Sequence, residues 1–136
     1  MDLSTAFANI NWLSVAAAGF SSFVVGGIWY GPLFGQAWMA EFDLSEEGLE
    51  QRNMTLVFSA SLALAVLAAT ILELFIGSDA DLLFGICAGF LAGLGWVTTF
   101  LGILYLFEMK SMRAFLINAG YCVTSLTLMG MILGAW

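Results

Sequence analysis

The sequence has little charge and no histidine. Of its 136 residues, 10% are charged and 62% are hydrophobic, whereas an average soluble domain is about 25% charged and about 45–50% apolar. A chain of this composition has too little polar surface to cover a soluble globule, and a lipid surrounding removes that difficulty. The absence of histidine removes the commonest metal ligand and the usual acid–base group near neutral pH.

Basic residues and cysteines are also scarce, at three Lys and Arg and two Cys. No basic patch is present, so nucleic-acid binding is not expected. Cys87 and Cys122 fall at depths that differ by about 10 Å, which is beyond the reach of a disulfide. There is no nucleophile–base pair, phosphate-binding glycine loop or metal-ligand spacing. We therefore predict no catalytic residue, no cofactor and no metal.

Four long apolar stretches are present, each near the length of about 20 residues that a helix needs to cross the hydrocarbon core. They cover residues 12–33, 54–76, 82–107 and 112–135. The runs are continuous and do not alternate with polar residues, which favours helices over the strands of a barrel. We predict an all-α membrane protein with one domain, residues 1–136, built as a four-transmembrane-helix bundle. No basic residue precedes the first span, so we expect it to be retained and not cleaved as a signal peptide.

The basic residues predict the orientation of the bundle. Arg52 precedes the second span, and Lys110 and Arg113 lie between the third and fourth. In a four-span chain these two loops share a side, and an excess of Lys and Arg marks the cytoplasmic side. We therefore expect a multi-pass protein of the cell (inner) membrane with both termini outside the cytoplasm.

The connection between the first and second spans is long enough to have structure of its own. Gly31-Pro32 is expected to end the first span. Four residues then recur at helical spacing and predict a short interfacial helix: Phe34, Trp38, Met39 and Phe42. Ser45 is suited to cap a further helix, with Glu46 and Glu47 in its first turn. We expect that helix to continue without a break into the second span.

Small residues form a stripe on every span. Gly85, Gly89 and Gly93 recur at intervals of four in the third span, and Gly130 and Gly134 do so in the fourth. Such residues let membrane helices approach closely, within one bundle or between subunits. A pore lined by backbone is the alternative interpretation. Because four helices make a thin bundle, outward-facing stripes favour a homo-oligomer.

Glu73 is the strongest candidate for a site within a span, because an ionisable residue in the membrane is a functional hypothesis by default. It lies near the outer end of the second span, where Asn11 and the Trp12 indole should reach a similar depth. A hydrogen bond from them would satisfy the carboxyl group. The functional alternative is an outward-facing cation or proton site.

A second polar group is expected in the cytoplasmic half. Asn118 and Tyr121 lie one turn apart on the fourth span, and Thr98 or Thr99 of the third span should reach a comparable depth. Hydrogen bonding between helices is the structural interpretation. A solute or ion site is the functional one.

Aromatic and charged residues mark the cytoplasmic boundary. Trp29 and Tyr30 fit the aromatic belt at the headgroup level. Glu108 lies beside Lys110 and Arg113, a cluster that would anchor the helices and the turn. Arg113 holding a lipid phosphate is the alternative.

Several blocks of the sequence resemble one family. They are Asn11-Trp12-Leu13, Gly27-Ile28-Trp29-Tyr30-Gly31-Pro32-Leu33-Phe34-Gly35, Trp38-Met39, Leu106-Phe107-Glu108, Phe115-Leu116-Ile117-Asn118-Ala119-Gly120-Tyr121 and Gly130-Met131-Ile132-Leu133-Gly134-Ala135-Trp136. Together they resemble the bacterial and fungal membrane family called domain of unknown function 1761. The turn Met109-Lys110-Ser111-Met112-Arg113 differs from the Gly-Arg-type turn associated with that family. The resemblance implies a small multi-pass membrane protein without an assigned activity, and it singles out Trp29, Tyr30, Pro32, Glu108, Asn118 and Tyr121.

Our leading hypothesis is a membrane-embedded oligomer that binds or passes a small solute or ion through the cytoplasmic-half cluster and Glu73. The polar groups retained inside apolar helices motivate it. The alternative is an accessory or structural subunit of a larger membrane complex. A membrane enzyme ranks third, and lipid binding is compatible with all three.

Overall fold

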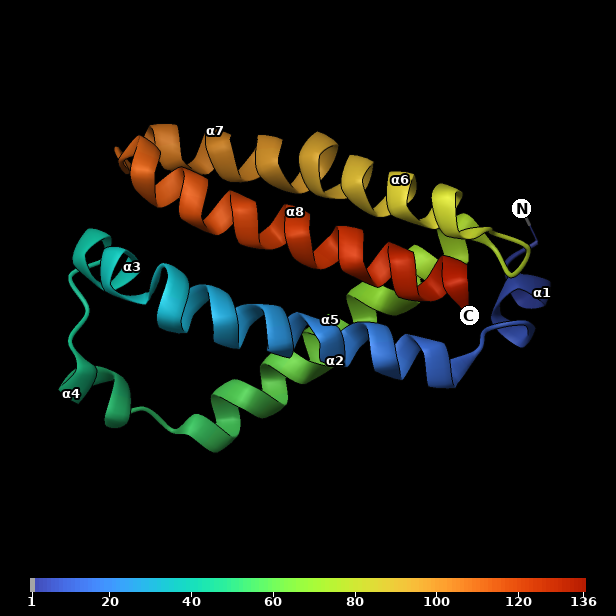
Figure 1. Ribbon diagram of the computed structural model, residues 1–136, viewed down its shortest axis with the longest axis horizontal. Coiled ribbons are helices and arrows are strands. Elements are labelled where there is room, and N and C mark those ends of the chain that lie inside the picture. Colours follow the sequence, from blue (N-terminus) through green and yellow to red (C-terminus); the bar gives the residue numbers. More distant parts are fainter. Residues whose placement is uncertain (1) are drawn as a thin grey trace.

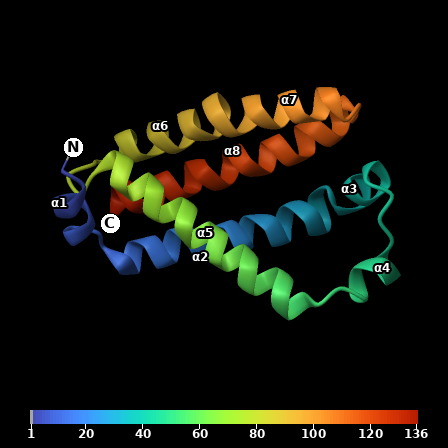
Figure 2. The same cartoon turned by 180° about the vertical axis from the view of Figure 1, so that it is seen from behind.

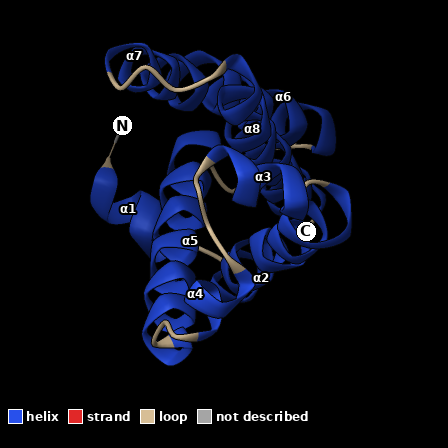
Figure 3. Ribbon diagram, turned by 90° about the vertical axis from the view of Figure 1, so that its left-hand side faces the viewer, coloured by secondary structure: helices blue, strands red, loops and turns tan. Residues whose placement is uncertain are grey.

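The computed structural model describes residues 2–136, and its elements in this range are helical (Figure 3). In chain order they are α1 (Leu3–Ala8), α2 (Trp12–Ile28), the π-helical turn η1 (Trp29–Leu33), α3 (Gly35–Glu41), α4 (Glu46–Glu50), α5 (Met54–Ile76), α6 (Leu82–Ala92), the π-helical turn η2 (Gly93–Thr98), α7 (Thr99–Phe107) and α8 (Met112–Ala135). Four stretches are long and apolar enough to cross a membrane: Trp12–Leu33, Met54–Ile76, Leu82–Phe107 and Met112–Ala135. They coincide with the four predicted spans, so the predicted fold class is confirmed.

The spans pack around α8 (Figures 1 and 2). The continuous arm of α6, η2 and α7 runs antiparallel to α8 along its length, and α2 lies against α8 as well. The helix α5 crosses α2 obliquely and then diverges from the bundle toward α4. Both termini lie at one end of the molecule, hereafter the terminal end. The helices α3 and α4 and the turn between α7 and α8 lie at the other, hereafter the loop end.

Glycines allow the backbones of α6 and α8 to touch. A Cβ atom at Gly85 would overlap the carbonyl oxygen of Gly130, and a Cβ atom at Gly130 would overlap that of Gly85. A side chain at Gly89 would meet the carbonyl of Leu126 in the same way. The stripes of the third and fourth spans are therefore used for close packing inside the bundle. Four other glycines have open space where a Cβ atom would stand: Gly27, Gly31, Gly77 and Gly95.

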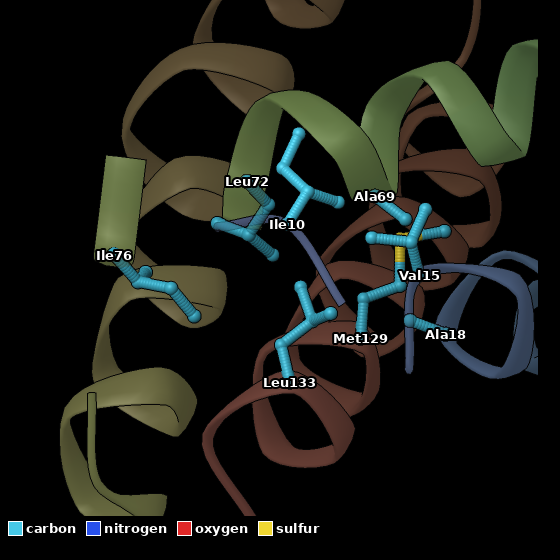
Figure 4. Close-up of a cluster of buried hydrophobic side chains, with 8 residues drawn as sticks. All are labelled: Ile10, Val15, Ala18, Ala69, Leu72, Ile76, Met129 and Leu133. Atoms are coloured by element: carbon cyan, nitrogen blue, oxygen red, sulfur yellow. The ribbon is translucent and has the colours of Figure 1, made fainter. Parts of the chain in front are cut away.

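The buried apolar core lies toward the terminal end, where α2, α5 and α8 meet (Figure 4). Its members are Ile10, Val15, Ala18, Ala69, Leu72, Ile76, Met129 and Leu133. In contrast, every residue of α5 from 54 to 64 is exposed, because this half of the helix diverges from its neighbours and no other part of the protein covers it. The bundle is thus closed at the terminal end and splayed at the loop end.

The first span ends in a π-helical turn that contains Pro32. Proline has no N–H and cannot donate to the carbonyl four residues before it. The turn is closed by the Phe34 amide, which donates to the Trp29 carbonyl five residues back at 2.8 Å. The short helix α3 follows at once, where the aromatic spacing predicted a helix. It ends with the Leu44 amide bonded to the Met39 carbonyl and with Asp43 at φ +52°, a left-handed helix cap.

The helix predicted after Asp43 forms but does not continue into the second span. Ser45 caps α4 as expected, its hydroxyl accepting from the Gly48 amide at 3.0 Å. The helix stops at Glu50, however, and Asn53 starts α5 by accepting from the Leu56 amide at 3.1 Å. The expectation of one unbroken helix is wrong because the Asn53 side chain competes for the amides that a continuing helix would use.

Candidate functional site

A pocket of about 390 Å³ lies at the terminal end of the bundle. It is surrounded by α1, the link that follows it, the last turn of α5 and the turn after that helix. Six residues give it a polar and acidic lining: Asp2, Thr5, Asn9, Glu73, Ser78 and Asp79. Within residues 2–136 no Lys or Arg lines it, so three carboxyl groups set its electrostatic potential.

The wall formed by α1 is fixed at both of its ends. The Asp2 carboxylate caps the helix and accepts from the Thr5 hydroxyl at 2.7 Å and from the Ser4 hydroxyl at 2.8 Å. These hydrogen bonds, that of Thr5 first, lower the pKa of Asp2, which therefore keeps its negative charge at neutral pH. After the helix, Ile10 is buried in the core and holds the link against the bundle.

Glu73 is the buried member of the acidic lining. Its side chain belongs to the last turn of α5 and is only 7% exposed. Its Oε2 atom has no hydrogen-bond partner among the described residues. A buried polar atom without a partner is costly. Glu73 is thus the group of this pocket that most needs a further interaction.

The side chains expected to satisfy Glu73 do not do so. Asn11 lies at the expected depth, but its side-chain oxygen caps α2 and accepts from the amides of Leu13 and Ser14 at 3.1 and 3.2 Å. Trp12 is 58% exposed. In the described part of the chain neither side chain makes a hydrogen bond to Glu73, because the start of α2 requires the Asn11 oxygen.

A hydrogen-bonded group in the loop-end half joins three spans. The Tyr30 hydroxyl donates to Oδ1 of Asn118 at 2.6 Å. The Asn118 amide in turn donates to the Tyr105 hydroxyl at 2.6 Å. The three half-buried side chains come from η1, α8 and α7. Asn118 therefore has a partner for each end of its amide.

Of the other residues expected near Asn118, Tyr121 joins the group indirectly. Its ring packs edge-on against that of Tyr30, with 5.3 Å between centroids, and its hydroxyl donates to the Ser22 carbonyl at 3.3 Å. The Tyr121 ring packs over Gly26, where an added Cβ atom would lie 3.5 Å from it, at ordinary van der Waals distance.

The two threonines take different positions. Thr99 is exposed, and its hydroxyl donates to the carbonyls of Gly95 and Trp96 in η2 at 2.8 and 2.9 Å. It thereby satisfies carbonyls of the π-helical turn and does not reach Asn118. The Thr98 hydroxyl is buried and has no partner among the described residues. The structure thus brings Asn118 and Tyr121 together around Tyr30 but does not bond either threonine to them.

The indole N–H of Trp29 also points into the bundle. Its indole N–H donates to the Ile117 carbonyl at 2.8 Å. A Cβ atom at Gly120 would lie 2.7 Å from the indole carbon Cζ2, so the ring packs directly against α8 at a position that has no side chain. Trp29 and Tyr30, which were expected at the headgroup level, therefore direct their donors toward α8.

The charges at the loop end pair differently from the sequence expectation. Glu41 of α3 accepts from the Ser111 hydroxyl at 2.5 Å and lies 3.9 Å from the guanidinium of Arg113. Lys110 lies over the Phe42 ring at 5.1 Å. Glu108 is exposed and pairs with neither base in the described range.

Sequence reasoning missed Glu41 and Tyr105. Glu108 lies beside the two bases in sequence, whereas Glu41 is about 70 positions away from Arg113. Glu41 ends an interfacial helix on the same predicted side as those bases, and this was the signal available for it. Tyr105 lies one turn before the predicted turn at Glu108, at a depth that an antiparallel fourth span brings opposite Asn118.

The two groups of polar residues have different chemical capacities. The Tyr30–Asn118–Tyr105 group has its partners within the chain, whereas Glu73, which lines the pocket, has a buried carboxyl oxygen without a partner among the described residues. No group of three or more His, Cys, Asp or Glu placed to hold a metal ion occurs in residues 2–136. The pocket at the terminal end is therefore the candidate functional site, and its acidic lining is suited to a cationic ligand.

Comparison with known proteins identifies the family. The chain belongs to the family described as "Protein of unknown function (DUF1761)", whose model matches residues 13–134. This confirms the resemblance inferred from the motif blocks and is consistent with the four membrane spans. No curated protein and no solved structure matches the chain.

Proposed function

We propose that this DUF1761 protein binds a small cation in the pocket at its terminal end, with Glu73 as the group that pairs with it. One observation carries the proposal: Glu73 is 7% exposed, lines the pocket and leaves Oε2 without a partner. An unpaired carboxylate in such a position is unfavourable, and a bound cation or proton offsets that cost.

The electrostatics of the pocket favour the same ligand class. Asp2 and Asp79 add two carboxyl groups at its rim, while all three basic residues belong to segments at the loop end. A concave site lined by one sign of charge raises the local concentration of counter-ions. The pocket therefore attracts small cations from the side on which the termini lie.

In this proposal the Tyr30–Asn118–Tyr105 group holds three spans in place and does not bind the ligand. Both ends of the Asn118 amide already have a partner within the chain, in contrast to Oε2 of Glu73. Asn118 is also about 16 Å along α8 from Met129, which packs in the core close to the pocket, at about 1.5 Å per residue. The proposal therefore concerns binding at one end and needs no path through the loop-end half.

Carbodiimide labelling tests the proposal. A lipid-soluble carbodiimide should modify Glu73 in the purified, lipid-reconstituted protein, and mass spectrometry of its peptides would locate and quantify the product. We expect at least one of Li⁺, Na⁺, K⁺, ammonium and methylammonium to slow labelling at Glu73 in a saturable way. Labelling of the exposed Glu108 serves as the internal control for ionic strength. If no cation protects Glu73 more than Glu108, the proposal is wrong.

A structural role in a complex is the second candidate function. It is favoured by the exposure of α5: no other part of the protein covers any residue from 54 to 64. A copy of this chain or another membrane subunit packing there would bury this helix. Native mass spectrometry of the protein extracted from its own membrane separates the cases. A fixed-ratio heteromeric complex supports the accessory role, and a monomer or homo-oligomer opposes it.

A further inference from the structure

We propose that the cation bound in this pocket is a primary ammonium group on a short aliphatic chain. The inference rests on the proposed function and specifies its ligand class. It is drawn from the acceptors that line the pocket, its size and the kinds of side chain in its wall.

The available acceptors match an ammonium group. A primary ammonium has three N–H donors and no acceptor. Oε2 of Glu73 is an acceptor in a side chain that is more than nine-tenths buried, and it has no partner in the described residues. Asp2 already accepts from Ser4 and Thr5, so it contributes mainly charge. Asn9 and Ser78, whose side chains carry further oxygens, also line the pocket.

The size and wall of the pocket favour an organic cation over a bare ion. Its volume of about 390 Å³ is large beside the share of about 30 Å³ that one water takes in the liquid. Part of the wall is apolar and comes from Ile10, Leu74 and Ile76. An inorganic ion would leave this apolar surface against water, whereas an alkyl chain would cover it. A wall that contains both carboxyl groups and apolar side chains fits an amine with a short carbon chain.

The wall also distinguishes between classes of organic cation. Quaternary ammonium groups are typically recognised by cages of aromatic rings. In the described part of the chain, no Phe, Tyr or Trp lines this pocket. A quaternary group also has no N–H to give to Glu73. We therefore expect primary amines to bind in preference to quaternary ones of similar size.

The test is ligand-dependent thermal stability of the full-length protein in lipid nanodiscs, with direct binding measured by equilibrium dialysis of radiolabelled propylamine. The ligands are propylamine, tetramethylammonium, Na⁺ and the uncharged propanol, compared at constant ionic strength. We expect propylamine to bind at least about tenfold more tightly than tetramethylammonium, as one charged hydrogen bond predicts. Glu73→Gln should remove the effect, and the matched control Glu108→Gln should retain it.

The outcomes distinguish failure of the amine inference from failure of the cation site. Equal or tighter binding of tetramethylammonium, or a response to Na⁺ alone that Glu73→Gln abolishes, overturns the amine inference and leaves the cation site in place. Propylamine binding unchanged by Glu73→Gln overturns both proposals, as does the absence of binding by every cation. If Glu73→Gln does not fold, Asp79→Asn in the exposed turn replaces it. We then expect several-fold weaker propylamine binding, and unchanged affinity overturns the amine inference.

Discussion

The Tyr30 hydroxyl donates to the Asn118 side-chain oxygen at 2.6 Å, although the two residues lie 88 positions apart in the sequence. The Asn118 amide also donates to the Tyr105 hydroxyl, so one side chain links three spans. This junction lies in the half of the bundle where α5 diverges, outside the main apolar cluster, although Ala114, Ile117 and Ala119 of α8 are also buried there. Directed hydrogen bonds therefore add to apolar packing in the half of the bundle that lies outside the main core.

Replacing Tyr30 with Phe should destabilise the protein by about 1 kcal/mol, the usual scale for hydrogen bonds between membrane helices. Reversible unfolding by SDS in mixed micelles measures this loss. Tyr121→Phe is the matched control, because the Tyr121 hydroxyl makes a longer hydrogen bond of 3.3 Å to a backbone carbonyl. A larger loss for the control than for Tyr30→Phe would contradict this account.

Gly130→Ala should be strongly destabilising, because the added Cβ atom would overlap the Gly85 carbonyl and separate α6 from α8. Overpacking of this kind costs about 1–3 kcal/mol. Gly27→Ala provides the comparison, since no atom lies within 4 Å of the position its Cβ would take. That variant should be as stable as the parent protein or slightly more stable. Thermal unfolding in detergent distinguishes the two, and similar melting temperatures would count against the packing described for α6 and α8.

Met109→Gly should stabilise the turn between α7 and α8. Met109 has φ +55°, and the Lys110 amide bonds to the Tyr105 carbonyl at 2.9 Å, the geometry of a Schellman cap. A side chain in this conformation costs about 1–2 kcal/mol, and the greater freedom of glycine in the unfolded chain cancels about half of the gain.

The measurement is the SDS unfolding midpoint, which should rise for Met109→Gly. Leu106→Gly serves as the control because Leu106 is 80% exposed but lies inside α7. Glycine within a helix costs about 1 kcal/mol, so the control should lose stability. A loss in both variants would show that Met109 is not under strain.

Both termini should face away from the cytoplasm, as the positions of Arg52, Lys110 and Arg113 predict. Alkaline phosphatase, which folds only outside the cytoplasm, should be active when fused after Trp136. The same enzyme fused after Lys110 should be inactive. The reverse pattern would place the pocket on the cytoplasmic side and change the compartment that supplies its ligand.

Much of the fold follows from local properties of the sequence. Span limits depend on runs of apolar residues, and the start of α4 depends on Ser45, so each was visible within a short window. The break before α5 was also encoded locally, in Asn53, but the apolar residues beyond it suggested a continuous helix. Errors of this kind arise where two local signals compete within a few residues.

The sequence by itself determined that this is a four-span membrane protein and which residues are polar within it. The tertiary structure decided which of those residues meet. Asn118 bonds to Tyr30 and Tyr105 and to neither threonine, Arg113 pairs with Glu41 and not with Glu108, and Glu73 borders a pocket formed by α1. Hydropathy and capping act within a few residues of the chain. Side-chain partners depend on the rotation and tilt of whole helices, which are set by close contacts such as those between Gly85 and Gly130.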